Sequence, residues 1–148
     1  MSILTVYDAL QGIHRNTTGI KKAGERLPES LNTDDLTYVY LWVESGEWER
    51  VSDFSLHFTT FVATTFVKPV AQGTKDDGFK VAARLCQELG ERYLSDITAG
   101  GAVQHMGRGA RYSPPTVEDS GIREFTWGGT TYWGFEYRIT VKEQILST

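Results

Sequence analysis

Three histidines are the first residues to consider for acid–base or metal chemistry, and their spacing favours neither. His14, His57 and His105 are scattered along the chain, and none stands in a metal-ligand pattern such as HExxH. His57 falls on the polar phase of an alternating segment, and His105 lies in a Gly-rich region. We therefore expect the three side chains to be hydrogen-bonded or solvated rather than catalytic.

Other residue types that could do chemistry also lack a pattern. The chain has no GxSxG sequence, and its "GRG" and "AGGA" stretches lack the strand–loop–helix context and the lysine of a phosphate-binding loop. Adjacent aspartates at 34–35 and 76–77 suit caps and turns better than a two-carboxylate site. The one cysteine, Cys86, excludes an internal disulfide and a multi-cysteine metal site, and the apolar helical pattern around it predicts a core residue. We predict no catalytic, cofactor-binding or metal-binding residue.

The charge of the chain restricts its partners. With 15 Lys and Arg against 19 Asp and Glu, the formal charge is −4, which argues against a general nucleic-acid binder. Arg108 and Arg111 with Tyr112 offer a group that can stack on a nucleobase. They lie in a Gly-, Pro- and Ser-rich stretch, residues 98–121, and long irregular stretches of this kind usually bind a partner or become ordered on contact.

Acidic residues are concentrated in one part of the chain. Residues 29–53 contain seven acids and one base, whereas residues 1–28 and 100–115 are mildly basic. A solvated loop explains the acidic segment. The alternative is an acidic patch that faces a basic patch on a neighbouring copy, which suits association in a ring.

Apolar periodicity predicts the elements that position these residues. Residues 2–13 and a segment from Asp76 or Asp77 to about Ser95 have the spacing of helices that bury one face. Residues 37–44 are apolar on both faces and predict a central strand, and residues 44–50, "ESGEWER", predict a charged hairpin tip.

One predicted strand is longer than the core of a small domain requires. Residues 54–67 alternate in polarity, with a change of phase at 59–60 that indicates a bulge or bend. At about 3.4 Å per residue this strand would extend roughly 45 Å. We expect part of it to project from the body.

The last predicted element is a hairpin that turns at residues 128–129, a Gly-Gly pair able to adopt positive φ. Its second strand places Trp133, Phe135, Tyr137, Ile139 and Val141 on one apolar face, which a sheet needs in order to cover a helix. Trp127 stands at the turn and need not be buried. It is the aromatic residue of this hairpin that we expect to serve a partner.

Together these elements predict a single α+β domain over residues 1–148. Its mostly antiparallel twisted β-sheet packs against two α-helices and carries an extended β-hairpin or loop. Hydrophobic residues make up 40% of the chain and charged residues 23%, as in ordinary globular proteins. We find no secretory signal and no apolar stretch long enough to span a membrane, and therefore expect a soluble protein made in a cytoplasm.

The order of several landmarks resembles a known family. They are "PESLNTDDL" at residues 28–36, "KPVAQG" at 68–73, "YLSDITAGGAV" at 93–103 and "WGGTTYWGFEYRITVKE" at 127–143. This order resembles the tail terminator, or tail completion, proteins of long-tailed bacteriophages over nearly the whole chain. The positions that match the family's motifs are Pro28, Ser30, Leu31, Asp96, Thr98, Gly100, Gly101, Trp127, Gly128, Gly129, Tyr132, Gly134, Val141 and Glu143.

Two positions depart from the family pattern. Leu36 is followed by Thr37 where the family often has Leu-Pro, and Ala99 stands where a Leu usually precedes the Gly. Both departures affect the local loop geometry. Neck proteins that lie between head and tail share the size and the style of fold, and they are the nearest alternative.

The resemblance implies a structural virion protein without enzymatic activity, cofactor or metal. A hexameric ring would sit on the last ring of the tail tube protein, end tube polymerisation and present a surface to the head–tail connector. It would be assembled in the host cytoplasm, and DNA would only pass through its lumen. A small α+β pocket-type enzyme is a further alternative, but it needs an inward Asp–His or Asp–Tyr pair, which the periodicity does not place.

A ring with head-to-tail contacts requires two different complementary surfaces on each copy. We expect them in the acidic tip at residues 44–53 and in the basic loop at residues 104–112. The residues predicted for subunit or partner contacts are Glu44, Glu47, Glu49, Arg50, Arg108, Arg111, Tyr112 and Trp127.

Overall fold

The structure, a computed structural model, describes residues 3–24, 31, 33–51, 54–70, 75–95, 105–106 and 117–146. These residues form an α+β fold of two α-helices, one 3₁₀-helix and a seven-stranded sheet. The order is α1 (Ile3–Arg15), β1 (Lys22–Gly24), η1 (Thr33–Asp35), β2 (Tyr38–Val51), β3 (Phe54–Pro69), α2 (Lys75–Ser95), β4 (His105–Met106), β5 (Val117–Asp119), β6 (Arg123–Trp127) and β7 (Thr130–Leu146). The α+β class and both helices agree with the sequence prediction. In the described part of the chain, no helix has the length and apolar character needed to cross a membrane.

The sheet is mixed, so the antiparallel prediction is met only in part. Its main path is β1-β2-β3-β7-β4, and β5 and β6 also pair with β7. All of these pairs are antiparallel except β1 with β2, which run parallel through Lys22 opposite Tyr38. A parallel pair needs a crossover connection, which the sequence pattern of a short strand does not reveal.

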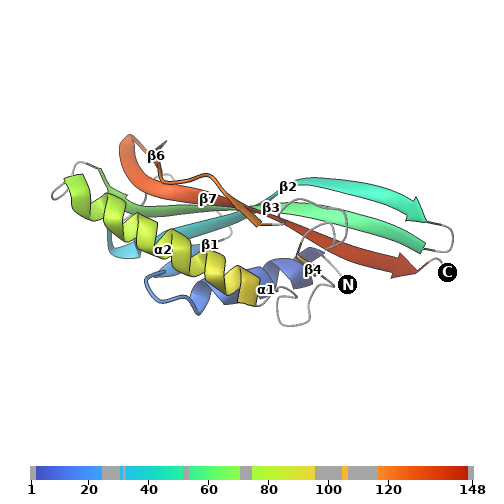
Figure 1. The fold of residues 1–148 in the computed structure, drawn as a ribbon. Coiled ribbons are helices and arrows are strands. Elements are labelled where there is room, and N and C mark those ends of the chain that lie inside the picture. The colour runs from blue at the N-terminus through green and yellow to red at the C-terminus, as the bar shows by residue number, and fades with distance from the viewer. Residues whose placement is uncertain are drawn as a thin grey trace.

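Both helices cover one face of the sheet (Figure 1). Each carries an apolar stripe at helical spacing, and these stripes meet the alternate residues of β3 and β7 that face them. Cys86 is buried in this core, as predicted. The apolar face predicted for β7 is confirmed: four of its five residues are buried, and Trp133 packs at the margin. The fully buried members of the core include Val6, Leu10, Val39, Phe61, Leu89, Tyr93, Phe135, Ile139 and Val141.

A second, smaller cluster lies on the other face. Phe66 stands five positions from Phe61 on β3, so the two side chains point to opposite faces. Phe66 packs with Tyr38, Tyr132 and Leu31, and the β6–β7 hairpin closes over them. The sheet is therefore buried on both faces at this end of the molecule.

The predicted C-terminal hairpin is confirmed in its register. Gly128 and Gly129 form the turn with φ of 58° and 81°, values that side chains other than glycine rarely adopt. Phe125 pairs with Tyr132, as the centred turn requires. The sequence located this hairpin correctly because its turn residues leave little choice of register.

The prediction of a charged hairpin tip at residues 44–50 is wrong. These residues continue β2 to Val51, and the antiparallel register of β2 and β3 runs to Val51 opposite Phe54. The sequence does not predict this strand because its residues are exposed on both faces. They therefore lack the alternation of polar and apolar side chains that identifies strands. The chain therefore reverses between Val51 and Phe54, which lie opposite each other.

The predicted bulge is in the neighbouring strand. Val43 pairs with Phe61 and Ser45 with Thr60, so Glu44 is the extra residue, on β2. The register of β3 with β7 is regular from Phe54 to Phe66. The phase of the sequence pattern changes because Phe58 and Phe61, three positions apart, point to opposite faces of β3 and both are buried.

The three long strands extend beyond the helix layer, as expected for the long strand predicted from the sequence (Figure 1). We call this part the arm and define it as residues 44–51 of β2, 54–60 of β3 and 140–146 of β7. The predicted helix boundaries differ from the observed ones by one or two residues. The second helix begins at Lys75, one or two residues before the cap predicted at Asp76 or Asp77.

Candidate interaction surface

One edge of the arm is open among the described residues. β1 pairs with β2 only from Tyr38 to Tyr40, and no described strand continues beside β2 from residue 41 onward. Each side chain from residue 43 to 50 is exposed. An edge strand of this length presents a row of backbone donors and acceptors that another chain can pair with.

Four of the predicted contact residues lie on this edge strand. Glu47, Glu49 and Arg50 are exposed near the end of β2. Glu44 is already used within the chain, because its carboxylate accepts a hydrogen bond from Arg138 Nε at 3.0 Å across β3. We therefore place Glu44 at the base of the arm as a structural ion pair and keep the other three as candidates for contacts.

Trp48 is the exposed aromatic residue of the arm, and the sequence prediction did not single it out. Its ring stacks on His57, with the centroids 3.9 Å apart and the planes 10° from parallel. His57 is buried, while Trp48 remains 63% exposed. The two residues are cross-strand partners in β2 and β3. A Trp inside the charged stretch "GEWER" was the signal available in the sequence.

The other predicted contact residues do not join this surface in the described structure. Trp127 is half-buried and packs against the second cluster, beside Tyr132 and Phe125. Arg108, Arg111 and Tyr112 lie outside the described residues, as does most of the predicted basic loop. Trp127 stays a prediction for partner contacts, but its packing gives it a structural role.

A shallow groove lies where the turn after α1 meets α2. It has a volume of about 170 Å³ and is lined by Thr18, Gly19, Val81, Arg84, Leu85 and Glu88. Gly19 has a φ of 99°, so the turn depends on glycine there. Val81 is 41% exposed, although it stands at the helical spacing of the buried Leu85, Leu89 and Tyr93. The groove thus combines an apolar wall with a guanidinium group.

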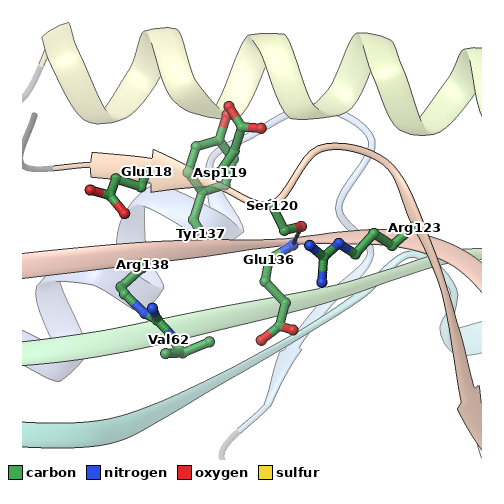
Figure 2. Close-up of a pocket in the computed structure, with 8 residues that line it drawn as sticks. All are labelled: Val62, Glu118, Asp119, Ser120, Arg123, Glu136, Tyr137 and Arg138. Carbon is green, nitrogen blue, oxygen red and sulfur yellow. Dashed lines mark hydrogen bonds between the residues drawn. The ribbon is translucent and has the colours of Figure 1, made fainter.

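A third feature is a charged cavity of about 210 Å³ on β7 (Figure 2). Its lining includes Glu118, Asp119, Arg123, Glu136 and Arg138, with Ser120 at its rim. Figure 2 shows Tyr137 directed toward α2 and its neighbours on β7 directed away from the helix. The lining therefore combines three carboxylates with two guanidinium groups.

The polar groups of this cavity hold the fold together. Ser120 Oγ accepts a hydrogen bond from the Glu136 amide at 2.9 Å and donates to the Gly121 carbonyl at 2.8 Å. The Glu136 carboxylate accepts from Thr64 Oγ1 at 3.2 Å. The Ser120 hydroxyl has no imidazole or carboxylate acceptor among the residues that line this cavity, so they do not form a nucleophile–base pair.

A buried hydrogen-bond chain joins α1, α2 and β1. Gln11 Nε2 donates to the Gly24 carbonyl at 3.1 Å, so its oxygen faces His14 Nδ1 at 2.8 Å. His14 Nδ1 must then carry the proton, and Nε2 accepts the hydrogen bond from the Tyr93 hydroxyl. Burial, followed by the charge of Arg15, lowers the pKa of His14 to about 3. The neutral imidazole is therefore a structural link between the helices.

Three further buried groups are held in their neutral forms. Burial raises the pKa of Tyr93 and that of Tyr137, and the Tyr137 hydroxyl donates to the Cys86 carbonyl. Burial also raises the pKa of the Cys86 thiol, which keeps it protonated and unreactive. The expectation for the histidines is met at His14, which is hydrogen-bonded. His57 is buried and stacked rather than solvated, and Thr59 Oγ1 lies 3.5 Å from its ring nitrogens. The side chain of His105 lies outside the described set.

Among the residues that the structure describes, no group of His, Cys, Asp and Glu side chains is arranged to hold a metal ion. The arm, the groove and the charged cavity are among the features of this part of the chain that offer contacts to other molecules. No protein-family model matches the sequence, and no curated protein is significantly similar to it.

Proposed function

We propose that this chain is a structural protein that forms a ring at the head-proximal end of a phage tail tube. The ring ends the polymerisation of the tube and joins the tail to the head connector. The sequence landmarks that resemble tail terminator proteins suggest this function. The observation that carries the proposal is the arm, a three-stranded extension with an open, charged edge.

The arm supports a role in assembly because residues 44–50 of its strand β2 contribute no residue to the core between the helices and the sheet. Residues 45–50 of β2 are exposed, yet they form a regular strand paired with β3. A long exposed edge strand is a liability for a protein that acts alone. The simplest explanation for this exposed edge strand is that another chain covers it.

The geometry also supports closed head-to-tail association. The arm leaves the body at one end, while the turn after α1 lies toward the other end (Figure 1). A surface at one end that contacts a different surface at the other end of the next copy gives a heterologous interface, which closes into a ring when the rotation allows it. The described residues therefore provide two candidate surfaces rather than one self-complementary patch.

The experiment compares virus particles assembled with and without the gene for this chain. Electron microscopy is expected to show overlong tails, or tails without heads, when the protein is missing. Tails of normal length without heads would favour a neck protein instead. Tails of normal length joined to heads, together with a monodisperse monomer in native mass spectrometry of the purified protein, would refute the proposal.

A further inference from the structure

The direction of the backbone groups along β2 shows where its open edge begins. The Thr37 carbonyl accepts hydrogen bonds from the Lys21 and Lys22 amides at 2.9 and 3.2 Å, so alternate carbonyls of β2 point toward β1. The Leu41 carbonyl points the same way, and it accepts a hydrogen bond from the Tyr7 hydroxyl of α1 at 2.7 Å. A side chain of α1 therefore fills the position beside residue 41, and the open edge follows it.

Exposed apolar side chains lie along the helix side of this edge. Val43 pairs with Phe61, a residue of the main core. Trp48 pairs with His57, which stands four positions before Phe61 on β3 and so points to the same face. Val43 and Trp48 therefore both lie on the helix side, where they are 44% and 63% exposed. A strand added to this edge would cover both.

A groove between α1 and β2 continues this apolar surface. It has a volume of about 450 Å³ and is lined by Leu4, Tyr7, Asp8, Leu41 and Trp42. Leu4 is 73% exposed. The groove lies where the open edge begins, and past it β2 runs beyond the helix layer (Figure 1). An added strand would therefore place its first apolar side chain in this groove.

The opposite face of the edge is acidic. Glu47 and Glu49 flank Trp48 in a regular stretch of β2, so their carboxylates lie on the face opposite the indole. Both side chains are exposed. Arg50, the cation of this segment, lies on the indole face instead. The face with the two glutamates thus favours basic side chains on a neighbouring strand, because opposite charges across a sheet attract.

Two copies of this edge do not suit each other. In an antiparallel pair related by a two-fold axis perpendicular to the sheet, opposite side chains share a face. Pairing centred on Trp48 would set Glu47 opposite Glu49, and pairing centred on either glutamate would set that residue opposite its own copy. The bulge at Glu44 interrupts registers centred nearer the body. Since like charges directly opposite each other destabilise a sheet, the edge suits a strand of different composition.

We propose that residues 43–50 of β2 are a strand-addition site for an extended segment of another protein in which apolar and basic residues alternate. The apolar side chains cover Val43 and Trp48 and enter the groove at α1, while the basic side chains face Glu47 and Glu49. The backbone of the segment pairs with the open edge. This inference rests on the proposed function for the place where the partner is met, and it deepens that function by naming the chemistry of the partner.

A labelled synthetic peptide as long as residues 43–50, with alternating valine and lysine, is the probe. In fluorescence anisotropy it is expected to bind the full chain about tenfold more tightly than a peptide with the same valines and lysines in two blocks. A peptide that alternates valine and glutamate is expected not to bind. Equal binding of the alternating and the block peptide would show that only net charge is recognised, and would overturn the proposal.

Methylation of the peptide nitrogens separates strand addition from contacts of side chains alone. In an added strand, alternate N–H groups point to β2 and the others point to solvent. One peptide is methylated at every valine nitrogen and another at every lysine nitrogen. One of the two is expected to lose binding and the other to keep it. Equal loss or equal retention would overturn strand addition.

Charge reversal on the chain tests the acidic face. The double variant Glu47→Lys with Glu49→Lys is expected to weaken binding of the valine–lysine peptide about tenfold and to create binding of the valine–glutamate peptide. The matched control, Glu118→Lys with Glu124→Lys, changes the net charge equally at exposed positions on β5 and β6. It is expected to leave both affinities within about twofold. An equal response of the two double variants would count against the proposed pairing.

Truncation of the indole tests the apolar face. Trp48→Ala is expected to weaken peptide binding about tenfold, as for a hot-spot aromatic residue. Leu94→Ala removes an equally exposed apolar side chain from α2 and is expected to leave binding unchanged. Circular dichroism checks that each variant is folded. Binding that tolerates Trp48→Ala would refute the apolar contact.

The outcomes separate this inference from the proposed function. Peptide binding with these specificities, together with normal tails joined to heads when the gene is missing, would support the site and refute the function. No peptide binding, together with overlong or headless tails, would refute the site and leave the function standing. Protection of the amides of residues 43–50 on self-association of the purified chain, measured by hydrogen exchange, would assign the edge to a second copy and overturn the proposed partner.

Discussion

His14 makes the stability of this fold depend on pH at mildly acidic values. Its imidazole is buried between Gln11 and Tyr93, and the positive charge of Arg15 lies nearby. Burial lowers the pKa in the folded state to about 3, from 6.5 in an exposed histidine. Below pH 6.5 the unfolded chain therefore binds a proton that the folded chain does not. The free energy of unfolding must fall as the pH falls through this range.

The magnitude follows from the two pKa values. Between pH 7.5 and pH 5.5, protonation of His14 in the unfolded chain lowers the free energy of unfolding by about 1.4 kcal/mol. This value changes little if the folded pKa is a unit higher, because the folded form is still unprotonated at pH 5.5. In a domain of this size it corresponds to a fall of roughly 3 to 6 °C in Tm. Carboxylates contribute mainly at lower pH, so this window isolates the histidine.

Urea unfolding at pH 7.5, 6.5 and 5.5 measures this effect. His14→Gln is expected to lose the dependence on pH, although it also loses stability at pH 7.5 because the hydrogen bonds with Gln11 and Tyr93 are disturbed. His57→Gln serves as the matched control, since it removes a buried histidine but keeps His14. This control is expected to retain the pH dependence of the free energy of unfolding. An unchanged slope in His14→Gln would show that another group controls the pH dependence.

Three further substitutions, two of them with a matched control, test a buried hydroxyl group, a close backbone contact and a surface ion pair. Thr65→Val is expected to stabilise the fold by about 1 kcal/mol in urea unfolding, because the buried Thr65 Oγ1 has no hydrogen-bond partner in the described structure. The control, Thr64→Val, is expected to destabilise the fold by about 1 kcal/mol, because it removes the hydrogen bond to Glu136. Equal effects of the two substitutions would contradict this reasoning. Gly134→Ala is expected to destabilise by about 1 to 3 kcal/mol, because its methyl group would collide with the Thr65 carbonyl oxygen, while Gly12→Ala in open space on α1 should be neutral or stabilising. Glu44→Gln is expected to cost less than about 1 kcal/mol and to lose that small effect in high salt, since the ion pair is exposed; a larger, salt-independent loss would argue against this assignment.

The parts of the fold that the sequence predicted well are those with a single buried face. The spacing of Leu85, Leu89 and Tyr93 identified α2 because all three point to one core. The register of the C-terminal hairpin was predictable because Gly128 and Gly129 determine its turn. In both cases local chemistry and tertiary packing favour the same structure.

The arm could be predicted only in part. The length of the strand at residues 54–67 indicated a projection, but residues 44–50 looked like a loop because their side chains are exposed on both faces. The stack of Trp48 on His57 depends on the pairing of these two residues across β2 and β3, which the sequence pattern does not predict. The groove beside α2 is lined by residues that are far apart in the sequence, so no local sequence pattern predicts it.

The open edge of β2 also has a consequence for amide hydrogen exchange. In an antiparallel edge strand, alternate N–H groups point to the neighbouring strand and to the solvent. From Trp42 to Arg50 the isolated chain should therefore exchange with a period of two, whereas the amides of β3, paired on both sides, should exchange slowly throughout. The bulge at Glu44 should shift the phase of this alternation by one residue. If another strand pairs with this edge in the assembled particle, the alternation should disappear and mark the residues that it covers.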